Sequence, residues 1–362
     1  MTSDLTITEL IQAYHDCRKH KRKTAAAIEF ESDLAVNIHT LYNELIENRY
    51  YPGRSICFVV KKPKIREVWA SNFRDRIVHH VLYNRYSTQF YNSFIHDSYA
   101  CIPGKGTLKA AERVQYFMRS CSETGTKDTW YMKADVANFF MSIDKSILDV
   151  LLSKKITDEW WMNLTRIILH HNPKDNVYIK SSVSDMELVP RKKSLIYAVA
   201  GFGLPIGNLS SQFFANVYMN ELDQYAKHVL KVKYYARYVD DIVMIGNDGG
   251  LLHEKYELMD VFVKGQLGLA FHPSKKDTNK IVHGVNFVGY IIKPNTRYLR
   301  SSTLRNLYHK MEAGFDGVCT ERAVVNSYFG MLRHTNGYHE RVRFKNMYQR
   351  LVYDVGLTKV II

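Results

Sequence analysis

The chain has 362 residues, of which 46% are hydrophobic, and this is enough apolar material for the cores of one or two domains. Its formal net charge of +14 favours a polyanionic partner, most simply a nucleic acid, over a basic surface that serves solubility alone. The five cysteines form no Cys-x-x-Cys pair, which argues against a disulfide framework and a zinc site. No apolar run reaches the ~18 residues of a membrane span and no signal peptide is recognisable, so we expect a cytoplasmic protein without a membrane partner.

The first part of the chain is predicted to be helical and is followed by strands. Residues 1–50 show helical patterning and carry a dense positive run at 18–23, which is either a solvated helix end or a phosphate contact. Two strand-like runs, 56–60 and 67–70, then flank a cationic tip at 61–66. This pattern predicts a β-hairpin.

Two glycine-rich loops each precede a predicted helix. The first, Pro103-Gly104-Lys105-Gly106-Thr107, is not a P-loop, because that motif requires Gly-Lys-Ser/Thr in succession after a longer loop. The second runs from Gly203 to Gly207, and the amides at the start of its helix suit a base pair or a phosphate lying against the backbone. A polar stretch at about 171–203 interrupts the chain before this second loop.

Carboxylates occur in two strand-like, largely apolar segments. One is the run 130–140, which contains Asp135. The other, 234–245, reads as a hairpin with Asp240 and Asp241 at or near its tip. Burying two adjacent carboxylates without a counter-charge costs several kcal/mol, and tight turns usually carry Gly, Asn or Pro instead. The pair is therefore better explained as metal ligands than as a polar turn.

Asp135 with Phe140 five positions later, and Tyr238-Val239-Asp240-Asp241, resemble the two catalytic motifs of reverse transcriptases. The resemblance covers roughly residues 50 to 300 and implies an α+β right-hand polymerase. Its parts would be fingers at 51–128, a palm with an antiparallel sheet and helices at 129–290, and a short basic helical thumb at 291–362. The palm would be interrupted by the insertion at about 171–203, and residues 1–50 would form a basic helical extension.

The resemblance also implies the chemistry. Three carboxylates would hold two Mg²⁺ ions, or Mn²⁺ in their place, one ion activating the primer 3′-hydroxyl and one binding the triphosphate. The implied ligands are Asp135, Asp240 and Asp241, with the backbone carbonyl of Val136 completing one site. Lys275 is implied as the group that protonates the leaving pyrophosphate, with Lys276 as its near rival.

The resemblance assigns further residues to the substrates. Those implied to bind the incoming nucleotide are Lys64, Arg66, Phe140, Ile206, Gly207 and Gln212. Those implied to contact template or primer are Lys105, Gly106, Phe287, Gly289 and Tyr290. The ring of Phe140 would lie under the deoxyribose and leave no room for a 2′-hydroxyl; the alternative is that Phe140 is a core residue like Phe139.

Ile206-Gly207 and Ser211-Gln212 stand where most relatives carry Gln-Gly and Ser-Pro. This variant resembles the reverse transcriptases of diversity-generating retroelements, and also those of bacterial antiphage defence. We therefore expect a prokaryotic enzyme that copies a dedicated non-coding or template RNA into cDNA from deoxynucleoside triphosphates, with an accessory protein or self-assembly as further partners. Two alternatives stay open: a catalytically idle RNA-binding protein on this fold, and a template-independent polymerase on the same palm.

Overall fold

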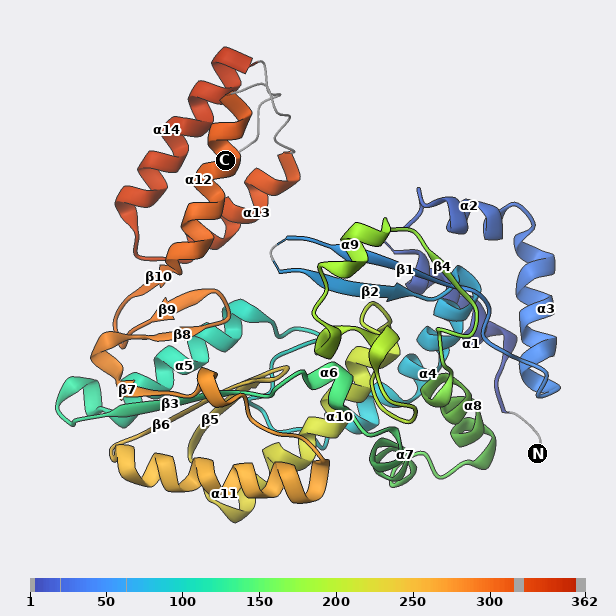
Figure 1. Ribbon diagram of the computed structural model, residues 1–362, viewed down its shortest axis with the longest axis horizontal. Helices are drawn as coiled ribbons and strands as arrows, with labels where there is room; N and C mark the ends of the chain where they lie inside the picture. The colour runs from blue at the N-terminus through green and yellow to red at the C-terminus, as the bar shows by residue number, and fades with distance from the viewer. Residues whose placement is uncertain (1–3, 20, 63, 316–321, 356–362) are drawn as a thin grey trace. The chain divides into compact units, whose positions relative to one another are not determined.

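The computed structural model describes residues 4–19, 21–62, 64–315 and 322–355 (Figure 1). It contains both helices and sheets, and the chain divides into two compact units. Unit 1 comprises Met1–His96, Val136–Tyr225 and Met259–Phe271, and unit 2 comprises Asp97–Asp135, Ala226–Leu258 and His272–Ile362.

Unit 1 begins with the predicted helices. They are α1 (Ile7–Arg18), α2 (Ala25–Glu31) and α3 (Leu34–Ile46). At the start of α1, Thr6 and Glu9 form a capping box, in which each side chain accepts from the other's backbone amide. The long helix α4 (Phe73–Tyr91) packs against α1 and against α10 (Leu209–Gln224). Further helices of this unit are α6 (Phe139–Ser142), α7 (Lys145–Ser153) and α8 (Glu159–His170).

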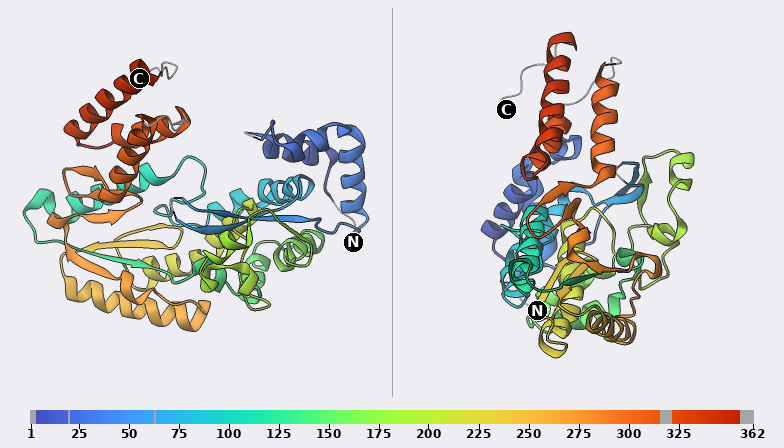
Figure 2. Two further views of the ribbon diagram at one scale, coloured as in Figure 1. Left: turned by 45° about the horizontal axis from the view of Figure 1, so that its top comes forward. Right: turned by 90° about the vertical axis from the view of Figure 1, so that its left-hand side faces the viewer.

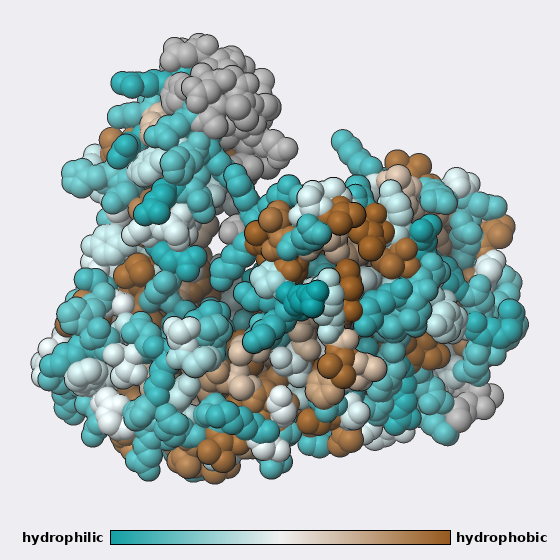
Figure 3. Space-filling model, viewed as in Figure 1, coloured by the Kyte–Doolittle hydropathy of each residue, from teal (hydrophilic) through white to brown (hydrophobic). Residues whose placement is uncertain are grey.

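The predicted hairpin of unit 1 is confirmed, and it gains a third strand. Strands β1 (Ser55–Val60) and β2 (Arg66–Ala70) are antiparallel. The stretch predicted only as a polar interruption supplies β4 (Val177–Ile179), which pairs parallel to β1, and the short helix α9 (Val183–Glu187). Apolar side chains lie exposed over this part of the surface (Figure 3). The stretch is therefore an ordered addition to the hairpin sheet.

The centre of unit 2 is a four-stranded antiparallel sheet of order β5-β6-β3-β7. Its strands are β3 (Trp130–Asp135), β5 (Tyr234–Tyr238), β6 (Asp241–Gly246) and β7 (Asp277–Lys280). Helix α5 (Thr107–Cys121) covers one face, and the part of α11 (Gly249–Leu267) that belongs to unit 2 lies along the other (Figures 1 and 2). The residues of β3, β5 and β6 are therefore mostly buried on both faces, whereas β7 is largely exposed.

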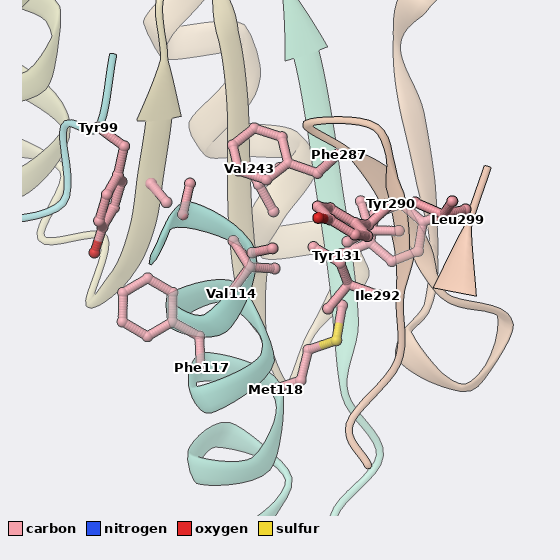
Figure 4. Packing of buried hydrophobic residues seen from close by; sticks show 14 of the residues in the cluster. Tyr99, Val114, Phe117, Met118, Tyr131, Val243, Phe287, Tyr290, Ile292 and Leu299 are labelled. Carbon is pink, nitrogen blue, oxygen red and sulfur yellow. The ribbon is translucent and has the colours of Figure 1, made fainter. Parts of the chain in front are cut away.

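One apolar cluster joins the sheet, α5 and the C-terminal part of unit 2. Val114, Phe117 and Met118 of α5 pack with Tyr131 and Val243 of the sheet (Figure 4). The cluster continues into a second sheet of order β10-β9-β8, made of β8 (Val285–Phe287), β9 (Tyr290–Ile292) and β10 (Arg297–Leu299). It ends among the helices α12 (Ser301–Phe315), α13 (Arg322–Arg333) and α14 (Tyr338–Val355). The sheet edge that carries the acids thus rests on a continuous core.

No helix in the described ranges is both long and apolar enough to cross a membrane.

Candidate active site

The sheet of unit 2 brings the three carboxylates to one edge. Strand β3 ends at Asp135 and the antiparallel β6 begins at Asp241, and these two residues are direct partners in the β-ladder. Asp240 lies in the two-residue turn that joins β5 to β6, as the sequence predicted. Apolar residues on either side fix the register, because a slip by one residue would turn every side chain to the other face.

Two lysine amines lie against these carboxylates. Lys275 Nζ is 2.6 Å from Asp135 Oδ1, and Lys133 Nζ is 3.2 Å from Asp241 Oδ1. Lys276 turns elsewhere: its amine is 2.9 Å from Glu257 Oε1. We refer to the end of the sheet that carries Asp135, Asp240 and Asp241 as the acidic edge. Of the two adjacent lysines, Lys275 contacts this edge and Lys276 does not.

The acidic edge carries unfavourable electrostatics. Burial, together with repulsion from Asp135 and Asp241, raises the pKa of Asp240 to about 6. Burial is also the main cause that raises the pKa of Asp241, while the Lys133 amine acts in the opposite direction. Asp241 Oδ1 is buried and accepts no well-formed hydrogen bond in the described structure, although it forms the ion pair with Lys133. Additional positive charge at this edge would therefore be favourable.

The residues present fit a hard divalent cation in chemistry. All three candidate side chains offer carboxylate oxygens, which Mg²⁺ prefers, and the buried Asp241 Oδ1 already lies against one cation, the Lys133 amine. Within the described ranges, however, no three His, Cys, Asp or Glu side chains are arranged as a preformed metal cage. The Lys133 and Lys275 amines each contact one oxygen of a carboxylate at this edge and so compete with a cation for that oxygen.

The residue after Asp135 is held by the backbone of unit 1. Val136 is buried, at 1% exposure, and pairs with Phe271 in an isolated antiparallel bridge. Two rings follow on α6: Phe139 is buried at 3% exposure, whereas Phe140 is only half-buried, and the ring centroids are 5.3 Å apart. Phe140 therefore differs in environment from its core neighbour.

The other residues implied to bind the nucleotide also lie in unit 1. Lys64 and Arg66 are exposed at the turn and at the start of β2, and Gln212 is exposed on α10. Ile206 accepts a hydrogen bond of 2.7 Å from the Trp69 amide through its carbonyl. The Lys64, Arg66 and Gln212 side chains are therefore accessible to a ligand. The Ile206 carbonyl already accepts a hydrogen bond within the protein.

The backbone conformation and the packing at position 207 both require glycine. Its φ is +128°, and a Cβ there would lie 2.7 Å from the Trp69 carbonyl oxygen. Only glycine allows this close approach of the loop to β2. The Gly-rich turn is therefore locked to the hairpin strand before α10 begins.

The implied template and primer residues lie in unit 2. Lys105 is half-buried, and its amine donates to the Ser98 carbonyl at 2.9 Å, while Gly106 precedes α5 with a φ of +134°. Phe287 and Tyr290 are buried at 0% and 3% exposure within the apolar cluster. The turn between them contains Gly289, with φ +92°. A primer can meet this hairpin through the backbone of its turn, because the two rings belong to the core.

Two residues that the sequence reasoning missed contact this edge. Lys133 precedes Asp135 by two positions on a strand and so shares its face, a spacing that could have identified it. Arg237 lies in the strand that leads to Asp240, and its side chain is fully buried at 0% exposure. The local sequence pattern contains no signal that this arginine is buried.

The fold defines the class of protein. The structure is similar to the telomerase of Candida albicans solved with a fragment of telomeric RNA, with a TM-score of 0.51 and 11% sequence identity. The match covers 83% of this chain and 55% of that chain. With the acids at one edge of an antiparallel sheet, this likeness confirms the expected right-hand polymerase fold.

Sequence comparison gives the family. Residues 59–292 match the model of the family described as reverse transcriptase (RNA-dependent DNA polymerase). The chain belongs to this family and is an RNA-directed DNA polymerase.

Curated relatives are distant. The chain is 23% identical to Protein YkfC of Escherichia coli strain K12, with 74% of each chain aligned. It is 21% identical to the Putative COX1/OXI3 intron 2 protein of Saccharomyces cerevisiae, where the match spans 68% of this chain but only 32% of that protein. The chain thus corresponds to about a third of the yeast protein and about half of the telomerase.

Proposed function

We propose that this protein extends a DNA primer on an RNA template, using Asp135, Asp240 and Asp241 as ligands of two Mg²⁺ ions. The ladder pairing of Asp135 with Asp241, with Asp240 in the adjoining turn, is the observation that carries the proposal. Such a metal pair supplies activation of the 3′-hydroxyl and neutralisation of the triphosphate when bound. The backbone carbonyl of Val136 is proposed as an additional ligand.

The chain's own residues then have separable tasks. Asp240 must be ionised to serve as a ligand, and its pKa of about 6 places this ionised form above that pH. The amine of Lys275 lies at the acidic edge, and we assign to it the proton that the leaving pyrophosphate accepts. General acids of this kind contribute about 10²- to 10⁴-fold in rate.

The substrate contacts are proposed as follows. The exposed cations Lys64 and Arg66 bind the triphosphate, Phe140 lies under the sugar, and the backbone of Ile206-Gly207 with Gln212 contacts the base pair. Lys105 and Gly106 contact the template, and the Phe287-to-Tyr290 hairpin contacts the primer through the Gly289 turn. The corresponding regions are fingers at 51–128, palm at 129–290 with the insertion at about 171–203, and thumb at 291–362, after the basic extension at 1–50.

For the biological role, we infer a prokaryotic retroelement enzyme in the cytoplasm that copies a dedicated RNA. The Ile206-Gly207 and Ser211-Gln212 variant supports either a diversity-generating retroelement or antiphage defence, and the bacterial relative YkfC supports a prokaryotic setting. An accessory protein or self-assembly would complete the particle. Sequencing the nucleic acid that co-purifies with the protein tests this role, because a dedicated RNA gives one dominant sequence.

The experiment for the activity uses a DNA primer on an RNA template with dNTPs and Mg²⁺. Templated extension is expected from the wild type and not from Asp240→Asn. A homopolymer product made without template would instead support a template-independent polymerase. RNA binding without any extension would support the idle RNA-binding protein, although clustered acids beside an anionic ligand give a mere binder no advantage.

A further inference from the structure

The turn that carries Asp240 is strained at the residue before it. Val239 has a φ of +58°, a left-handed conformation that a β-branched residue rarely adopts. Two-residue hairpins that need a positive φ at this position normally use glycine. Such outliers persist only when the surrounding structure holds them in place, and they concentrate at active sites.

Arg237 provides that hold from two residues away. Its Nη1 donates to the carbonyl oxygen of Val239 at 2.9 Å, and its Nη2 donates to Ser98 Oγ at 3.1 Å. The side chain is fully buried, and so is Ser98. A buried guanidinium destabilises the fold unless its N–H groups are hydrogen-bonded. The Val239 carbonyl and the Ser98 hydroxyl therefore fix the position of the guanidinium, and the guanidinium in turn fixes the Val239 carbonyl.

The backbone fixes the same two segments to each other. The Arg237 amide donates to the Asp97 carbonyl, and the Tyr99 amide donates to the Arg237 carbonyl, each at 3.0 Å. Ser98 and Arg237 thus form a parallel bridge that extends the sheet beyond β5. Tyr99 anchors this segment in the apolar cluster (Figure 4). The backbone of Arg237, from which the guanidinium extends, is therefore held in place by hydrogen bonds on both sides.

Ser98 also connects to the glycine-rich loop. Its carbonyl accepts from Lys105 Nζ at 2.9 Å while its hydroxyl accepts from Arg237. One residue thereby joins the loop that contains Lys105 to the turn that carries Asp240. We refer to Arg237, Ser98 and Val239 as the Arg237 clasp.

We propose that Arg237 is a positioning residue for DNA synthesis: through the clasp it holds Val239 in the left-handed conformation that aims Asp240, and ties this turn to the Lys105 loop. This inference rests on the proposed polymerase function. It assigns Arg237 no contact with substrate or metal. Its effect on the reaction passes through the conformation of Val239.

The experiment compares Arg237→Lys, Val239→Gly and the double variant in single-nucleotide extension. Lysine cannot donate to both acceptors in the fork geometry of arginine, so the maximal rate should fall by about 5- to 150-fold, with RNA affinity unchanged. Val239→Gly removes the strain, so its own rate is the reference for the double variant. If the clasp serves to hold Val239, the double variant should recover to within about threefold of Val239→Gly.

A readout independent of activity is hydrogen exchange of the peptide covering residues 235–244, which should become faster in Arg237→Lys. The matched control is Asn247→Ala, since Asn247 donates to Cys121 O and Asp128 O at the opposite end of the same hairpin. This control should lower the melting temperature without lowering the maximal rate. A rate loss in Arg237→Lys that Val239→Gly does not restore would overturn the proposal.

Should Arg237→Lys fail to fold, Ser98→Ala decides the same question, because it removes one acceptor of the clasp and leaves the guanidinium. We expect a loss of about tenfold in maximal rate, restored by Val239→Gly. Wild-type rate and wild-type exchange in Ser98→Ala would contradict the clasp. A wild-type protein that extends no primer would instead contradict the proposed function.

Discussion

The amine of Lys275 lies 2.6 Å from Asp135 Oδ1, whereas the neighbouring Lys276 forms an ion pair with Glu257 and lies 4.2 Å from the ring centroid of Tyr256. Two adjacent, chemically identical side chains thus have different surroundings. One faces the acidic edge of the sheet, and the other is held on α11. This difference separates the candidate proton donor from its rival.

Replacement of Lys275 by alanine should therefore lower the maximal rate of nucleotide addition by about 10²-fold or more. Lys276→Ala is the matched control. Its rate should stay within about threefold of wild type, because Lys276 contacts Glu257 and Tyr256 and not the three carboxylates of the acidic edge. Single-turnover extension with saturating dNTP measures both rates. Equal losses in the two variants would remove Lys275 from its proposed role.

Asp240→Asn should abolish nucleotide addition while making the protein more stable at pH 8. The pKa of Asp240 is raised from 3.8 to about 6 in the folded state. Protonated Asp240 therefore favours the folded state. This contribution to the free energy of unfolding is complete below pH 3.8 and is lost as the carboxyl ionises, when the pH rises through about 6. Asparagine avoids the cost of the buried charge, a difference on the order of 1–3 kcal/mol at 1.36 kcal/mol per pKa unit.

Thermal melts of wild type and Asp240→Asn between pH 4 and pH 8 measure this difference, which should shrink towards pH 4. Mg²⁺ should raise the melting temperature of the wild type at pH 8, since a ligand that binds only the folded state stabilises it, and should have little effect on the variant. RNA binding should be retained. Extension by Asp240→Asn within a few-fold of wild type would exclude Asp240 as a ligand.

Phe140→Ala tests sugar selection. If the half-buried ring lies under the deoxyribose, its removal should let the folded enzyme accept ribonucleotides. A 2′-hydroxyl buried without a partner costs about 1–3 kcal/mol, or about 5- to 150-fold in rate. The ratio of dGTP to rGTP incorporation measures this selectivity. Phe139→Ala serves as the control, and its fully buried ring predicts a lower melting temperature with an unchanged ratio; an unchanged ratio in Phe140→Ala would place that ring in the core too.

The net charge of +14 predicts steeply salt-dependent RNA binding. If six or more phosphates are neutralised by lysine and arginine, affinity should fall by roughly 10³-fold or more between 50 and 200 mM salt. Fluorescence anisotropy with a labelled RNA measures the slope. A flat titration would show that the positive charge serves another purpose.

The sequence by itself determined the local elements and the kind of chemistry. The apolar runs around Asp135 and around Asp240-Asp241 predicted strands because alternation and β-branched composition are local properties. The hairpin around Lys64 and the helix after Gly207 were predictable for the same reason. Two adjacent acids inside a largely apolar run indicated a cation on energetic grounds. These inferences need no knowledge of what lies across the sheet.

The tertiary structure decided which side chains meet. The pairing of Asp135 with Asp241 depends on long-range register, and so do the burial of Phe287 and Tyr290 and the addition of β4 beside β1. Arg237 reads locally as a charged strand residue, yet its side chain is fully buried and its backbone pairs with Ser98. Strand alternation tells which face a residue occupies, but burial and hydrogen-bond partners come from segments distant in the chain, and only packing fixes those.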